Sequence, residues 1–127
     1  MKLRYRNGLL FTSLEINYQN NMKVIDNVVL DTGAAETIIS PDAVEDIGII
    51  AEFDDMIGSF YGIGGSIHNY YTKKIDEVSI ESVKLQQVKV NFGIIDVKGE
   101  INGLLGLDIL LKTNAIIDLK QLSLKMY

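Results

Sequence analysis

The sequence lacks the residues on which several kinds of functional site depend. It contains no cysteine, which excludes disulfide bonds and thiolate metal sites. Its one histidine, His68, excludes a histidine-rich metal centre, and any histidine-dependent nucleophilic mechanism would have to run through that residue. A single proline and eleven glycines among 127 residues argue against a disordered or fibrous chain.

Excess positive charge and long apolar runs are also missing. The net charge of −5 gives no electrostatic reason to bind nucleic acid or an anionic membrane. No apolar run approaches the length of a membrane span, and the basic start of the chain carries an apolar stretch too short for a signal peptide. We therefore expect a cytoplasmic protein that binds neither nucleic acid nor membrane.

What remains is an apolar sequence with strand-like patterns. The chain is 47% hydrophobic and long enough for one domain over residues 1–127. Alternating and Val/Ile-rich segments predict a mostly β fold, with strands over residues 10–17, 23–30, 37–39, 75–80, 83–92, 115–119 and 122–126. Short helices are predicted over residues 40–48, with Ser40 as the N-cap, and from about Leu107.

The tripeptide Asp31-Thr32-Gly33 is the most informative motif, and it occurs once. It follows the apolar run at residues 28–30, so Asp31 would stand at the end of a buried strand as an acid or base. Thr32 suits an extended backbone and its hydroxyl can lock the turn, while Gly33 allows close backbone approach. An ordinary Asp-x-Gly turn is the alternative. Because two carboxylates are needed to share a proton, this chain would have to pair with itself.

A second motif is a glycine-dense tip inside a predicted hairpin over residues 56–72. The tip reads Gly62-Ile63-Gly64-Gly65. It fits either an ordinary hairpin with a flexible turn or a mobile hairpin that closes over a ligand. A phosphate loop is excluded because neither a helix nor a Lys-Ser/Thr pair follows. We expect His68 to be an exposed position on the hairpin arm without a catalytic role.

The third motif, over residues 103–110, is a glycine-bearing apolar strand that becomes a helix. Gly103 and Gly106 predict close backbone packing, not a solvated loop. Asp108 could be taken for a second catalytic acid. We assign it instead to the first turn of the helix, where the helix dipole stabilises it.

These three motifs, in this order, resemble the retropepsin-like aspartic proteases, the family of the retroviral proteases and their single-domain cellular relatives. The resemblance spans roughly Val24 to Met126. It implies a closed β-barrel-like fold with one or two short helices. It also implies a symmetric homodimer that cleaves a peptide or protein substrate without a metal or any other cofactor.

The resemblance also implies the role of each site residue. The catalytic residues would be Asp31, Thr32 and Gly33, with one Asp31 from each subunit activating a water and Thr32 bonding across the dimer. Substrate would be bound by Ala34, Ala35, Glu36, Gly62, Ile63, Gly64 and Gly65. Leu104-Leu105-Gly106 would pack beneath the active-site loop. Apolar lining by Ile38, Ile63 and Leu104 would favour hydrophobic substrate residues.

Two positions depart from the retroviral pattern. Ala35 stands where an acidic pair usually begins, and Leu107 stands where an arginine usually follows the apolar-apolar-Gly segment. That acid and that arginine normally pair, so the joint loss leaves no unpaired buried charge but removes one support of the familiar dimer. A catalytically silent peptide-binding or assembly module with the same fold is therefore the alternative to an aspartic endopeptidase. A small ligand-binding β-barrel unrelated to proteases is a third hypothesis, and it requires the ordered motifs to be coincidental.

Overall fold

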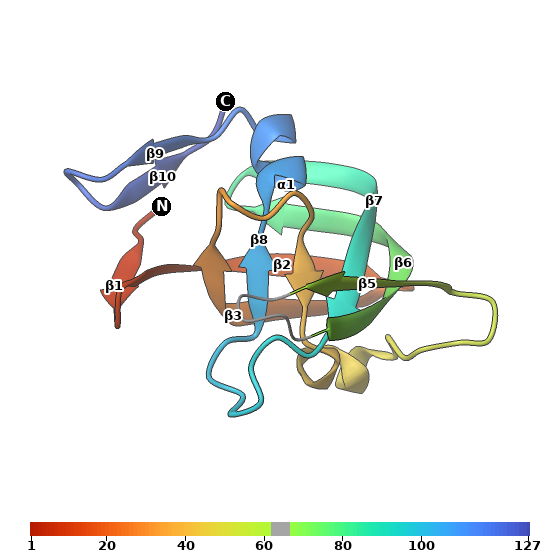
Figure 1. Ribbon diagram of the computed structural model, residues 1–127. Helices are drawn as coiled ribbons and strands as arrows, with labels where there is room; N and C mark the ends of the chain where they lie inside the picture. The colour runs from red at the N-terminus through yellow and green to blue at the C-terminus, as the bar shows by residue number, and fades with distance from the viewer. Residues whose placement is uncertain (62–66) are drawn as a thin grey trace.

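The computed structural model describes residues 1–61 and 67–127, and most of these lie in strands (Figure 1). The strands are β1 (Arg4–Arg6), β2 (Leu9–Tyr18), β3 (Asn21–Leu30), β4 (Ile38–Ile39), β5 (Met56–Tyr61), β6 (Ile67–Ile80), β7 (Val83–Gly93), β8 (Gly103–Leu105), β9 (Ile116–Asp118) and β10 (Ser123–Lys125). The helical elements are α1 (Leu107–Lys112) and the 3-10 turns η1 (Pro41–Ala43) and η2 (Glu45–Ile47). The prediction of a mostly β fold with short helices is confirmed.

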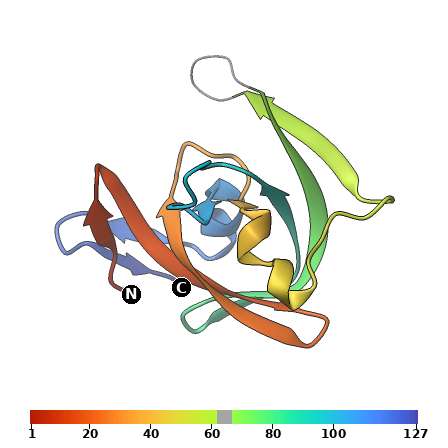
Figure 2. The same cartoon turned by 90° about the horizontal axis from the view of Figure 1, so that it is seen from below.

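The large sheet curls back on itself. Its strand order is β1-β2-β3-β8-β4-β7-β6-β5, and β2 pairs with β6 as well as with β1 and β3. Since β2 therefore joins distant parts of the sheet, the strands wrap around a common centre (Figure 2). β8 runs parallel to β3, and β4 runs parallel to β7. The parallel pairing places the end of β3 directly beside β8. The Asp31 motif therefore meets the motif over residues 103–110.

The two chain ends form a smaller unit beside this sheet. β9 and β10 form the predicted final hairpin, and Lys2 bridges to Ser123 on the other edge of β10. The amide of Leu124 donates to the carbonyl of Met1 over 2.8 Å. The N-terminal segment is thus held by β10 of the same chain. Within the described residues, no helix has the length and apolar character needed to cross a membrane.

Two local predictions differ from the structure. The hairpin arm and the strand predicted over residues 75–80 are one continuous strand, β6, and the buried, ion-paired Lys73 lies within it. The helix predicted over residues 40–48 is wrong: η1 and η2 replace it, and Ser40 makes no side-chain capping bond. Val44 separates the two turns with φ −126° and is fully buried. The non-helical backbone of Val44 divides the segment, while Gly48, at φ 87°, ends it as expected.

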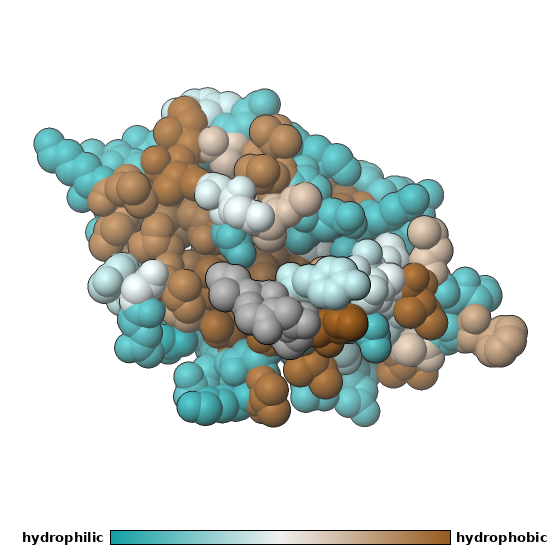
Figure 3. Space-filling view, in the orientation of Figure 1, coloured by the Kyte–Doolittle hydropathy of each residue, from teal (hydrophilic) through white to brown (hydrophobic). Residues whose placement is uncertain are grey.

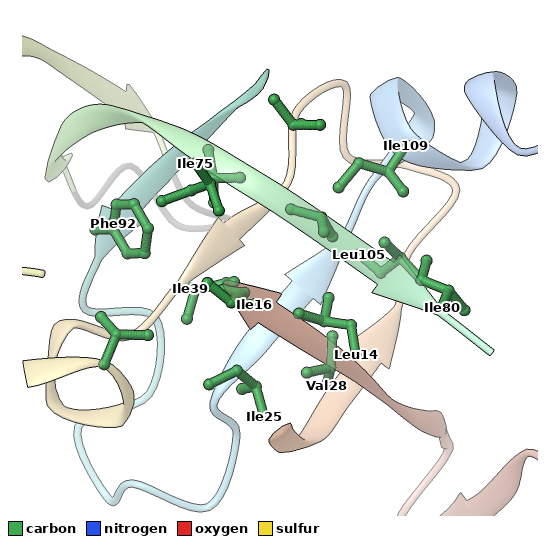
Figure 4. Close-up of a cluster of buried hydrophobic side chains, with 14 of the residues drawn as sticks. Leu14, Ile16, Ile25, Val28, Ile39, Ile75, Ile80, Phe92, Leu105 and Ile109 are labelled. Carbon is green, nitrogen blue, oxygen red and sulfur yellow. The ribbon is translucent and has the colours of Figure 1, made fainter. Parts of the chain in front are cut away.

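The core fills the centre of the curled sheet (Figure 4). Its largest fully buried members come from most of the strands, from α1 and from the segment after η2: Phe92, Ile16, Ile25, Ile39, Ile49, Ile75, Ile80, Leu105, Ile109 and Leu124. Leu105 in β8 and Ile109 in α1 both belong to this cluster. They anchor the segment on which the Asp31 turn rests, so burial of apolar surface fixes the base of the site.

Candidate active site

The turn that carries Asp31 begins where β3 leaves the sheet. The backbone amide of Asp31 donates to the carbonyl of Leu105 in β8 over 3.0 Å. The Asp31 Oδ1 atom accepts the amide of Gly33 at 2.9 Å, and the amide of Ala34 donates to the Asp31 carbonyl at 3.2 Å. Asp31 is half-buried, while Thr32 and Gly33 are exposed. The turn therefore presents the carboxylate at the surface from a backbone that hydrogen bonds hold in place.

The start of α1 supports this turn from beneath. The amide of Leu107 donates to the carbonyl of Ala34 at 2.8 Å, and the amide of Asp108 donates to the carbonyl of Ala35 at 3.2 Å. A Cβ atom on Gly106 would lie 2.8 Å from the Ala34 carbonyl oxygen, closer than real side chains approach. The predicted close packing of residues 104–106 beneath the loop is confirmed, and glycine is required at position 106 by this contact.

Thr37 and Asp108 link the far end of the loop to α1. The buried Thr37 hydroxyl donates to Asp108 Oδ1 at 2.7 Å and accepts the amide of Gly106 at 3.0 Å. The Thr37 amide lies 3.0 Å from Asp108 Oδ2, and the amide of Ile109 donates to Oδ1 at 2.8 Å. Asp108 is in the first turn of α1 as predicted. Its carboxylate is occupied in holding the loop, a role that sequence reasoning missed because Thr37 is 71 positions away.

A pocket opens beside the Asp31 turn. It is lined mainly by apolar side chains from the loop, β4, β5, β6, β7 and β8: Ala34, Ala35, Glu36, Ile38, Phe60, Tyr70, Asn91 and Leu104. The structure thus brings predicted loop residues together with Ile38 and Leu104. The predicted residues Gly62, Ile63, Gly64 and Gly65 lie outside the described residues. Sequence reasoning missed Phe60, Tyr70 and Asn91. The aromatic content of the hairpin gave a signal for the first two, and nothing in the sequence pointed to Asn91.

Two glycines make room for the aromatic wall of the pocket. Tyr70 pairs across the sheet with Gly58 in β5 and with Gly93 in β7. A Cβ atom on Gly58 would lie 2.4 Å from the Tyr70 ring, and one on Gly93 would lie 2.7 Å from a backbone oxygen. Next to Tyr70, the ring of Phe60 stacks on His68 with centroids 5.0 Å apart. This stacking leaves His68 half-buried, whereas we expected an exposed position.

The base of the β5–β6 hairpin contains the most buried ion pair of the described residues. Lys73 is 6% exposed, and its Nζ atom lies 2.9 Å from Asp55 Oδ2 and also contacts Glu52. Burial acts to raise the pKa of Asp55, but hydrogen bonds from Lys73 and from the Glu52 amide bring that pKa below its usual value. This cluster ties the segment before β5 to β6. Among the described residues, no three acidic or histidine side chains gather as a metal site.

The sequence matches a known protein family, and the fold is similar to that of solved structures. A family profile described as aspartyl protease matches residues 13–109. No curated protein matches the sequence. The structure is similar to a retropepsin-like aspartic protease from Rickettsia conorii, with TM-score 0.64 and 18% identity over 92% of this chain and 82% of that one.

Two further solved structures have the same arrangement. The EIAV protease in complex with the inhibitor HBY-793 gives TM-score 0.64 and 19% identity, covering 91% of this chain and 99% of that one. The retroviral protease-like domain of Ddi1 from Leishmania major gives TM-score 0.61 and 16% identity, covering 93% and 87%. At these identities the similarity shows a shared retropepsin-like fold.

Proposed function

The chain belongs to the aspartyl protease family, and from this premise we propose that it is an aspartic endopeptidase with a catalytic pair made of Asp31 from two identical subunits. The observation that carries the proposal is the Asp31 turn, which β8 and α1 support and which borders the apolar pocket. The motif occurs once in the sequence, so a second subunit must supply the other carboxylate.

The proposed chemistry needs only the two carboxylates and water. Two carboxylates held a few ångströms apart repel each other, so the pair retains one proton and titrates as a unit. The ionised partner takes a proton from a water held between them, and that water attacks the peptide carbonyl. The protonated partner donates to the developing oxyanion. Thr32 would bond across the dimer beneath the pair, and Gly33 would let the two turns approach each other.

The substrate would lie extended between the Asp31 turn and the β5–β6 hairpin. Its backbone would bond to neighbouring strands, and alternate side chains would enter pockets on either side. Ala34, Ala35 and Glu36 would form one wall of the cleft. Residues 62–65 would close over the substrate from the hairpin tip, as the glycine-dense sequence suggests.

The test is hydrolysis of a diverse peptide library from about pH 4 to 7 by the wild-type protein and by Asp31→Asn. Asparagine retains an oxygen that can accept the Gly33 amide, so the turn should survive while the acid–base chemistry is lost. We expect the replacement to lower kcat/KM by at least about a hundredfold. Asp26→Asn, which neutralises an exposed carboxylate outside the site, should cleave at the wild-type rate.

One observation favours a second candidate, a peptide-binding or assembly module that does not cleave. Ala35 and Leu107 replace the acid and the arginine that strengthen the familiar dimer, and Leu107 is 37% exposed. Peptides that bind but are cut neither by the wild-type protein nor by Asp31→Asn would support the module and contradict the protease.

A further inference from the structure

Resting on the proposed function, we propose that the pocket beside the Asp31 turn selects a substrate residue with an aliphatic stem and a cationic end, lysine or arginine. Glu36 is then the residue that determines this specificity. The reason is a single carboxylate held in a fixed position at the edge of an otherwise apolar pocket.

A buried amide holds the Glu36 side chain toward the pocket. Asn91 is 7% exposed, and its Nδ2 atom donates to Glu36 Oε2 at 3.1 Å. Asn91 lies in β7, opposite Thr72 in β6 and beside Ile38 in β4, so its position is fixed by strands on both sides. Glu36 itself is exposed, and both it and Asn91 line the pocket.

The hydrogen bonds around Asn91 have only one consistent direction. A carboxylate accepts hydrogen bonds, so the Asn91 amide group must turn its NH₂ toward Glu36. Its Oδ1 atom then accepts the Thr72 hydroxyl at 2.7 Å. The chain of bonds runs from Thr72 through Asn91 to Glu36 and orients the carboxylate without neutralising its charge. Among the described residues, no lysine or arginine forms an ion pair with Glu36.

The walls of the pocket suit the stem of a long side chain. Ile38 and Leu104 form its floor side by side, since β4 and β8 are paired at these residues. Phe60 and Tyr70 add aromatic surface from the hairpin. Lysine and arginine bury their methylene groups against such surface and keep the charged end at the rim, where Glu36 lies. Ile38 and Leu104 alone predict a pocket that prefers hydrophobic side chains. Such a side chain would make no ion pair with the Glu36 carboxylate.

The experiment measures binding and cleavage separately with the same peptides. Labelled peptide pools carry lysine, norleucine or glutamate at one fixed position, and norleucine matches the lysine stem without its charge. Binding is measured by fluorescence anisotropy with Asp31→Asn, which retains the pocket, and cleavage is measured with the protein carrying Asp31. At one fixed position we expect the lysine pool to bind and be cut about fivefold better than the norleucine pool.

Changing Glu36 to glutamine should bring this ratio close to one, and Glu36→Lys should favour the glutamate pool. The matched control is Glu100→Gln, which makes the same change in net charge at an exposed site outside the pocket and should keep the preference. Raised salt should also weaken the preference.

Each outcome separates this inference from the proposed protease activity. Equal binding of lysine and norleucine pools at every position overturns the inference, whether or not peptides are cut. A lysine preference in binding that depends on Glu36, without cleavage, supports the inference and overturns only the protease. Absence of both binding and cleavage overturns both.

Discussion

At the scale of single residues, the hydroxyl of Thr37 joins parts of the chain that are distant in sequence. It is fully buried, donates to Asp108 and accepts from the Gly106 amide. Both partners belong to the segment whose Leu107 and Asp108 amides donate to carbonyls of the Asp31 loop. Removing the hydroxyl would leave a buried amide without an acceptor and a carboxylate with fewer donors, which costs more than the bond itself gains.

Thr37→Val tests this link because valine has nearly the same shape and no hydroxyl. We expect the free energy of unfolding, measured in urea, to fall by about 2 kcal/mol. The control is Thr37→Ser, which keeps the hydroxyl and loses one methyl group, and which should cost clearly less. A valine variant as stable as the wild-type protein would show that the hydrogen bonds contribute nothing.

At the scale of elements, the ion pair at Lys73 decides how the β5–β6 hairpin is attached. Burial acts to lower the pKa of Lys73, but Glu52 and Asp55 bring it above its usual 10.5. The pKa of Asp55 lies below its usual 3.8. A lowered carboxyl pKa adds stability at pH values above 3.8. This stability is lost as the pH falls through the pKa of the folded state. A raised ammonium pKa adds stability at pH values below 10.5. This stability is lost as the pH rises through the pKa of the folded state. The pair should therefore contribute fully between these limits.

Asp55→Asn should destabilise the protein by about 3 kcal/mol at neutral pH, because the buried ammonium keeps only the exposed Glu52 as a counter-charge. Urea unfolding at several pH values measures this effect, and the difference from wild type should shrink below about pH 4.

Two further variants control this prediction. Glu52→Gln should cost less than about 1 kcal/mol, since that side chain is 58% exposed. Adding Lys73→Met to Asp55→Asn removes the buried ammonium that has lost its buried counter-charge, and should recover much of the loss. If Asp55→Asn proved no worse than Glu52→Gln, burial would not be what gives the pair its strength.

At the scale of the whole molecule, our proposal makes the Asp31 turn one half of an active site shared by two identical subunits. The face around α1 and the adjoining area beside β3 carries many apolar side chains (Figure 3). Leu107 and Leu111 on α1 and Ile116 on β9 are among the exposed ones. Because the Leu107 amide bonds to the Asp31 loop, this surface adjoins the turn that would meet its symmetry mate in the proposed dimer.

Mixing subunits tests the shared site directly. Wild-type protein mixed with a threefold excess of Asp31→Asn should retain about one quarter of its activity once subunits have exchanged, because most wild-type chains then sit in mixed dimers. The same excess of an unrelated protein should leave the rate unchanged. Activity that survives mixing in full would mean that each subunit works alone.

The sequence determined the parts of this protein that depend on neighbours along the chain. Alternating and Val/Ile-rich segments are enough to predict most strands, because side chains of a strand alternate between its faces and branched residues favour extended backbone. The Asp31 turn and the glycine at position 106 are visible because each marks a backbone requirement. The segment predicted as one helix over residues 40–48 forms two 3-10 turns instead, divided at the buried Val44.

Only the tertiary structure decided which distant residues meet. The parallel pairing of β3 with β8 carries Leu105 to Asp31, and the curl of the sheet carries Thr37 to Asp108 and Asn91 to Glu36. No local pattern encodes these contacts, since a buried polar side chain takes whichever partner the fold brings within reach. The chemistry that we propose for the Asp31 motif can therefore be inferred from the sequence. The support of its loop and the charge at its pocket follow from how the strands pair.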